Sequence, residues 1–159
     1  MRILVNIAFL IGFLGIAGGF GYWVNTRFVA NDDFIAAAAR GDLDGVRKGL
    51  ANHAGINATN MEGNNALGLA VKGGHFEIVK VLVDAGADVN KRTLDTSPLA
   101  WSLVHNHMEI FQLLRARGAL LDCTKLEYDQ LVQQAKNRGG GPMLDLLQKQ
   151  YEKEGGARQ

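Results

Sequence analysis

The hydrophobic pattern of residues 65–90 predicts two short helices followed by a turn. The first starts at Ala66, carries leucine and alanine on one side, and ends at the pair Gly73-Gly74. The second starts at Phe76, places apolar side chains at helical spacing, and stops at Gly86, where a left-handed glycine favours a helix end. Neither helix could bury its apolar side alone, so we expect the pair to pack against neighbouring pairs.

The same pattern recurs along the chain. His75 and His107 are 32 positions apart, and Gly41 and Gly74 are 33 apart. Three copies cover residues 33–57, 65–90 and 97–122, and a fourth over 126–151 keeps only the helix pattern. The last copy has polar residues on its predicted surface, which is typical of the cap that closes a solenoid core.

This period and the motif A-L-x-L-A, followed by G-G-H-F-E-I-V-K-V-L-V-D-A-G-A-D-V-N, resemble the ankyrin repeat, whose usual opening is T-P-L-H-x-A. The resemblance implies an all-α ankyrin-repeat solenoid of three repeats and a degenerate C-terminal capping repeat, with β-turn fingers between the helix pairs. The repeats fall at about 32–64, 65–96, 97–124 and 125–152, before a disordered tail over 153–159. Gly68 and Ala100 occupy the positions of the usual histidine, so its hydrogen bonds are expected to be absent.

The resemblance also implies a function, because ankyrin stacks bind partner proteins through their concave face and fingers. The residues that it assigns to this surface lie on two fingers and on the first helices of the repeats. They are Arg40, Met61, Glu62, Asn64, Lys72, Thr93, Leu94, Thr96, Val104 and His105. Met61 and Leu94 are expected at adjacent finger tips, where apolar side chains are not needed for the protein's own core.

Residues 3–24 form an uncharged run with one strongly polar side chain, Asn6. As a helix the run would span about 33 Å, enough for the hydrocarbon core of a bilayer. Tyr22 and Trp23 lie where an aromatic belt would be expected. We therefore expect a transmembrane signal-anchor helix over 1–24. A buried core helix and a signal peptide cleaved after Ala17 are the alternatives.

The charges beside this run give a slight bias in orientation. Arg2 precedes it, and Arg27 follows it in a juxtamembrane linker over 25–31. The bias favours a cytoplasmic N-terminus and places the repeats on the periplasmic side of a bacterial inner membrane. Signal cleavage would instead release the protein into the periplasm.

A stripe of small residues is predicted on one face of this helix, and its spacing is 4, 3 and 4. Its members are Ala8, Gly12, Gly15 and Gly19. Such a stripe lets another helix approach closely, in a second copy of the chain or in another membrane subunit. The alternative is that glycine is simply common in membrane segments.

The composition argues against several classes of function. A net charge of +1 with dispersed basic residues gives no electrostatic footprint for nucleic acid. His105 and His107 have no carboxylate or cysteine at ligand spacing, and Cys123, the one cysteine, is better explained as a small packing residue than as a nucleophile. We expect no catalytic residue, no metal and no cofactor.

The sequence therefore favours a membrane-anchored protein-interaction module that is not an enzyme. Two other readings remain open. One is an accessory structural subunit of an integral membrane complex, held by its glycine-rich transmembrane helix. The other is a periplasmic immunity or stress-protection protein, a step that rests on association because fold does not fix function.

Overall fold

The computed structural model describes residues 20–93, 96–139 and 141–155, and side chains from residue 30 onward. These residues form helices joined by turns and two isolated β-bridges, as expected for an all-helical repeat stack. In chain order the helices are α2 (Phe20–Arg40), α3 (Leu43–Ala51), α4 (Ala66–Gly73), α5 (Phe76–Asp84), α6 (Pro98–Val104), α7 (Met108–Ala116), α8 (Lys125–Asn137) and α9 (Gly141–Lys153).

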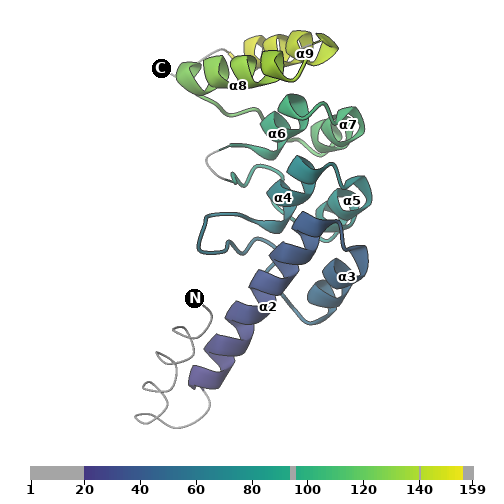
Figure 1. The fold of residues 1–159 in the computed structure, drawn as a ribbon, viewed down its shortest axis with the longest axis vertical. Coiled ribbons are helices and arrows are strands. Elements are labelled where there is room, and N and C mark those ends of the chain that lie inside the picture. Colours follow the sequence, from purple (N-terminus) through teal and green to yellow (C-terminus); the bar gives the residue numbers. More distant parts are fainter. Residues whose placement is uncertain (1–19, 94–95, 140, 156–159) are drawn as a thin grey trace.

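The helices stack in two layers along the long axis of the molecule (Figure 1). The first helices of the pairs, α2, α4, α6 and α8, pack on one another in order, and α3, α5 and α7 form the second layer behind them. The core lies between the layers and is mainly apolar. Its fully buried side chains include Val46, Leu82, Leu99, Leu103, Leu114 and Leu147.

Side chains that cap the first helices also bind the last part of the same repeat. Asn65 Oδ1 accepts a hydrogen bond from the Gly68 amide at 2.8 Å, while Asn65 Nδ2 donates to the Arg92 carbonyl at 3.1 Å. Ser97 Oγ donates to the Leu121 carbonyl at 2.7 Å. Each cap therefore satisfies a helix terminus and holds the segment that leads into the following repeat.

Two histidines link adjacent repeats. His75 Nε2 lies 3.3 Å from the Ala39 carbonyl oxygen, and His107 Nε2 lies 3.4 Å from that of Lys72. Each ring thus reaches the last turn of the first helix in the preceding repeat. The sequence placed both histidines at helix corners but gave them no such role.

The last two helices close the stack. Four side chains expected on the surface of the cap are exposed: Gln130, Gln133, Gln134 and Lys136. The tail differs from the expectation at its start, because the Glu154 carboxylate accepts hydrogen bonds from the Leu121 and Asp122 amides at 2.8–3.2 Å. Residues 156–159 lie outside the described part of the chain.

The expectation of a transmembrane helix ahead of the stack has to be corrected. Among the residues that the structure describes, no helix is both long enough and apolar enough to cross a bilayer. Residues 1–19 lie outside this part, and residues 20–24 belong to α2, which continues to Arg40 and includes Arg27, Asp32 and Asp33. The small-residue stripe over Ala8 to Gly19 also lies outside the described residues.

The long α2 has a simple explanation. Residues 25–31, expected as a linker, contain neither glycine nor proline, so nothing in the sequence interrupts the helix. Asn31 already contacts the first repeat, where its Oδ1 accepts a hydrogen bond from the Gly55 amide at 2.7 Å. The pair Asp32-Asp33 therefore lies in the middle of a helix and does not begin one.

Candidate protein-binding surface

The first finger is a hairpin closed by the β-bridge between Thr59 and Asn65. Asn60 organises its tip, because Asn60 Oδ1 accepts hydrogen bonds from the Glu62 amide at 3.1 Å and the Asn64 amide at 2.9 Å. Gly63 has φ +77° at this turn, which confirms the expected left-handed position. The tip is therefore held by local hydrogen bonds without help from another repeat.

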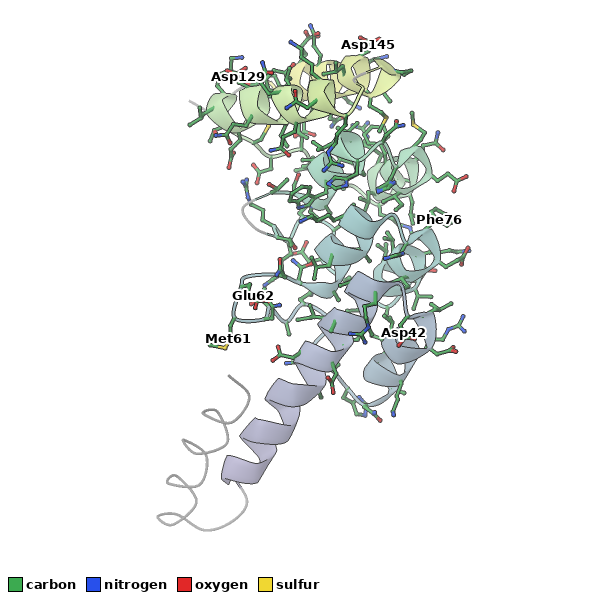
Figure 2. All side chains as sticks on the ribbon, viewed as in Figure 1. Asp42, Met61, Glu62, Phe76, Asp129 and Asp145 are labelled. Atoms are coloured by element: carbon green, nitrogen blue, oxygen red, sulfur yellow. The ribbon has the colours of Figure 1, made fainter. Side chains whose placement is uncertain are left out.

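Met61 and Glu62 point away from the stack at this tip (Figure 2). Met61 is 89% exposed, the most exposed of the large apolar side chains in the described residues. Glu62 Oε2 accepts a hydrogen bond from Asn60 Nδ2 at 2.6 Å, so the carboxylate is held at the same tip as Met61. The finger thus offers an apolar contact next to a negative charge.

The second finger contributes less side-chain surface than the sequence suggested. The Thr93 amide and carbonyl pair with those of Thr96 at 2.9 and 3.1 Å. Thr93 is fully buried against Gly68, so its side chain cannot reach a partner. Thr96 is half-buried, and Leu94, the other expected tip residue, lies outside the described residues.

Between the fingers and the helix corners lies an aromatic and basic wall, defined here as Lys72, Trp101, His105 and Arg138. Lys72 Nζ lies 5.0 Å from the centre of the Trp101 ring, and Trp101 meets His105 edge to face at 5.4 Å. Arg138 Nη1 approaches His105 Nδ1 at 3.5 Å. The wall therefore joins side chains of α4, α6 and the end of α8.

His105 remains neutral near pH 7 within this wall. Burial, together with the positive charges of Arg138, His107 and Lys72, lowers the pKa of its imidazole to about 4. A neutral ring can lie beside two cations without repulsion. Its Nε2 is buried without a hydrogen-bond partner.

Two other expected site residues have different positions. Val104 is 1% exposed and belongs to the core, so it forms no part of an outer wall. Arg40 is exposed at the end of α2. Lys72, in the wall, is half-buried, and so is Asn64, in the first finger.

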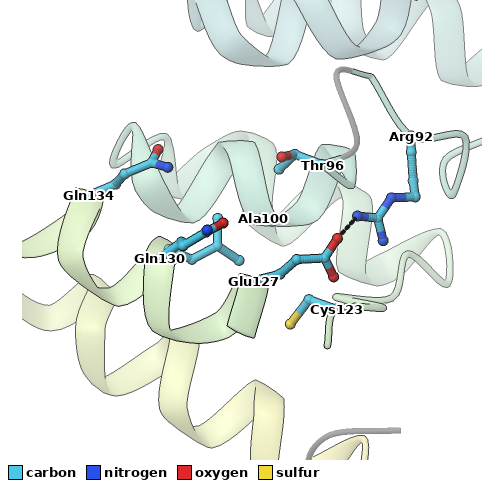
Figure 3. A pocket seen from close by; sticks show the side chains of 8 residues that line it. Arg92, Thr96, Ala100, Cys123, Glu127, Gln130 and Gln134 are labelled. Atoms are coloured by element: carbon cyan, nitrogen blue, oxygen red, sulfur yellow. Dashed lines mark hydrogen bonds and ion pairs between the residues drawn. The ribbon is translucent and has the colours of Figure 1, made fainter. Parts of the chain in front are cut away.

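A small hollow of about 130 Å³ lies between the second finger, α6 and α8 (Figure 3). An ion pair between Arg92 and Glu127 crosses its edge, and Arg92 Nη1 also donates to the Asp122 carbonyl at 2.7 Å. The pKa of Glu127 is lowered, mainly because its carboxylate accepts a hydrogen bond from the Thr124 backbone amide. The hollow is polar, and the Arg92–Glu127 ion pair lies at its opening.

Cys123 lines this hollow without the properties of a nucleophile. Burial raises the pKa of its thiol to about 11, with Glu127 adding to the effect, so the thiolate is scarce near neutral pH. In the described part of the chain, no three histidine, cysteine or acidic side chains gather as metal ligands would.

Sequence reasoning missed Trp101 and Arg138 as members of the wall. The available signal for Trp101 was its position in the repeat, where the preceding copy has Leu69, 32 residues earlier. No sequence signal indicated Arg138, because its proximity to His105 depends on how the capping repeat packs on the third repeat. The Arg92–Glu127 pair likewise joins residues 35 positions apart.

The comparison with protein families agrees with this architecture. The family model described as ankyrin repeats (3 copies) matches residues 34–125, which is more than half of the chain. The chain therefore belongs to the ankyrin-repeat family. Ankyrin repeats generally mediate protein–protein interaction and are typically not enzymes.

Three relatives support the same assignment. The chain is 30% identical over 92 residues to the putative ankyrin repeat protein YahD of Escherichia coli K12, covering 57% of this chain and 46% of the relative. It is 35% identical over 97 residues to the ankyrin repeat and KH domain-containing protein mask-1 of Caenorhabditis elegans, covering 60% and 3%. It is 31% identical over 100 residues to the putative ankyrin repeat protein L371 of Acanthamoeba polyphaga mimivirus, covering 60% and 13%. The chain thus spans less than half the length of these relatives.

Proposed function

We propose that the protein binds a partner protein through the first finger and the concave side of the stack, with Met61 as an apolar anchor. The observation that carries this proposal is the 89% exposure of Met61 at a tip fixed by hydrogen bonds. An ordered apolar side chain in water contributes nothing to the protein's own core and is available for burial by a partner.

The wall of Lys72, Trp101, His105 and Arg138 supports the same proposal. Aromatic and arginine side chains are enriched where interfaces concentrate their binding energy. The wall is positive at neutral pH because its histidine is neutral and its two cations have no carboxylate partner in the described residues. The partner segment that meets it is therefore acidic or rich in hydrogen-bond acceptors.

Site-specific photo-crosslinking tests this proposal. A photoreactive amino acid is placed at position 61 of the full chain, and in a control protein at position 126, where Leu126 is 69% exposed on the cap. Both are irradiated in the cells that carry the gene, and the adducts are identified by mass spectrometry. The proposal expects a partner captured from position 61 but not from 126, and equal adducts from both positions would contradict it.

The readings of a structural subunit and of an immunity or stress-protection protein remain predictions from the sequence. The first depends on residues 1–19, outside the described residues. The compartment, expected to be the periplasmic side, depends on the same segment. No contact in the described part favours either reading over partner binding.

A further inference from the structure

The packing of the second layer changes at the C-terminal end of the stack. Helix α3 packs on α5 and α5 on α7, but α9 packs mainly on α6 and α8, and its contact with α7 is slight. This leaves a groove of about 370 Å³ between α7 and α9, which we call the α7–α9 groove. Helices α7 and α9 lie on the side of the stack away from the fingers (Figure 1).

Two apolar side chains, Phe111 and Leu146, line the floor of the α7–α9 groove. The side chains of Gln112 and Gln150 also line it, and Gln150 is only 6% exposed. The side-chain amide of Gln150 donates to the Glu154 carboxylate and is therefore already satisfied. The floor consequently offers an apolar surface to an incoming side chain.

The rim of the groove is basic on both sides. Arg115 comes from the last turn of α7, and Lys149 and Lys153 lie one turn apart on α9. None of the three forms an ion pair with another described residue, and no acidic residue lines the groove. Glu154, close in sequence, is held by the Leu121 and Asp122 amides. The rim therefore presents three positive charges around an apolar floor.

We propose that the α7–α9 groove binds an acidic segment of a protein that carries an apolar side chain, which enters between Phe111 and Leu146 while carboxylates meet the basic rim. Charge complementarity selects an acidic occupant, and the apolar floor selects one with a hydrophobic residue among the acids. This site is separate from the finger surface and stands whether or not the first finger binds a partner.

Fluorescence anisotropy at low salt tests the site with defined probes and the full chain. The probe is a labelled peptide of glutamate and leucine, and two control peptides replace leucine by alanine or glutamate by lysine. The proposal expects the glutamate–leucine peptide to bind, the glutamate–alanine peptide to bind about tenfold more weakly, and the lysine–leucine peptide not to bind.

Paired protein variants then locate the binding. Lys149→Gln with Lys153→Gln should weaken binding of the glutamate–leucine peptide about fivefold to tenfold, because two rim charges are lost. The matched control, Lys48→Gln with Lys80→Gln, removes two exposed lysines from α3 and α5 and should leave binding unchanged. Thermal melts establish that both variants stay folded.

Three outcomes would overturn the proposal. One is no binding of the glutamate–leucine peptide, and another is equal loss in the two lysine pairs, which would mean general charge attraction. The third is retention on phosphatidylglycerol vesicles that depends on Lys149 and Lys153 without peptide binding, which would assign the groove to a membrane surface.

Discussion

The imidazole of His107 lies with Nε2 3.4 Å from the carbonyl oxygen of Lys72, across the boundary between the second and third repeats. His75 and Ala39 repeat this relationship across the preceding boundary at 3.3 Å. The last carbonyls of a helix have no partner within the helix, so a donor from the next repeat satisfies one of them. These histidines therefore connect adjacent repeats.

Replacing His107 by alanine should destabilise the stack. The variant loses a hydrogen bond to Lys72 and the ring that packs against Gly74, and we expect a loss of about 1–2 kcal/mol in the free energy of unfolding. Urea unfolding followed by circular dichroism measures it. His53→Ala, which changes an exposed histidine, is the control and should remain within about 0.5 kcal/mol of the parent protein.

A second prediction concerns the glycine that replaces the usual histidine of the repeat. A Cβ on Gly68 would lie 2.0 Å from Thr93 Oγ1, a collision inside a buried contact. Gly68→Ala should therefore lower the free energy of unfolding by about 1–3 kcal/mol, although alanine favours helices. Gln133→Ala on the exposed side of α8 is the helical control. Equal or greater stability of Gly68→Ala would show that the second finger can move away from α4 without cost.

Much of this fold follows from the sequence because its signals are local. The spacing of apolar residues predicted the helix pairs, and Gly63 and Gly86 have the positive φ expected of a turn and a helix end. The start of α2 could not be predicted in this way. A linker was expected over 25–31, but neither glycine nor proline lies between residue 24 and residue 34, so the helix continues through it.

The candidate surface was less predictable than the fold. The exposure of Met61 and Glu62 follows from their turn, whose hydrogen bonds are within the finger. The burial of Thr93 depends on Gly68, 25 positions earlier in the same repeat, and that of Val104 depends on the capping repeat. The α7–α9 groove arises from the packing of α9 on α6, which no periodicity encodes.

Acid should weaken the stack through His105. Its pKa is lowered to about 4 in the folded protein from an ordinary value of 6.5, so the unfolded chain takes up the proton first as the pH falls. The contribution of neutral His105 is complete above about pH 6.5 and is lost as the pH falls towards 4. The melting temperature should decrease over this interval, and His105→Gln should flatten the decrease. A slope unchanged by this substitution would assign the acid sensitivity to other groups.

The thiol of Cys123 should react slowly while the protein is folded. Its pKa is raised from 9.0 to about 11, so the thiolate fraction at pH 8 falls about a hundredfold below that of an unperturbed thiol. Alkylation by iodoacetamide, followed by mass spectrometry, should be slower than in the guanidinium-unfolded chain by a similar factor. Equal rates would mean that the hollow lined by Arg92 and Glu127 opens readily.

Binding of a partner protein by the first finger is tested most directly by measuring the affinity for the partner crosslinked at position 61. Isothermal titration calorimetry compares the parent protein with a variant in which Met61 and Leu94 are both changed to aspartate. We predict that this variant loses about 2 kcal/mol or more of binding free energy while its melting temperature is almost unchanged. The Leu126→Asp variant on the cap should keep its affinity. An affinity unaltered by the finger-tip changes would contradict the account and move the interface away from the fingers.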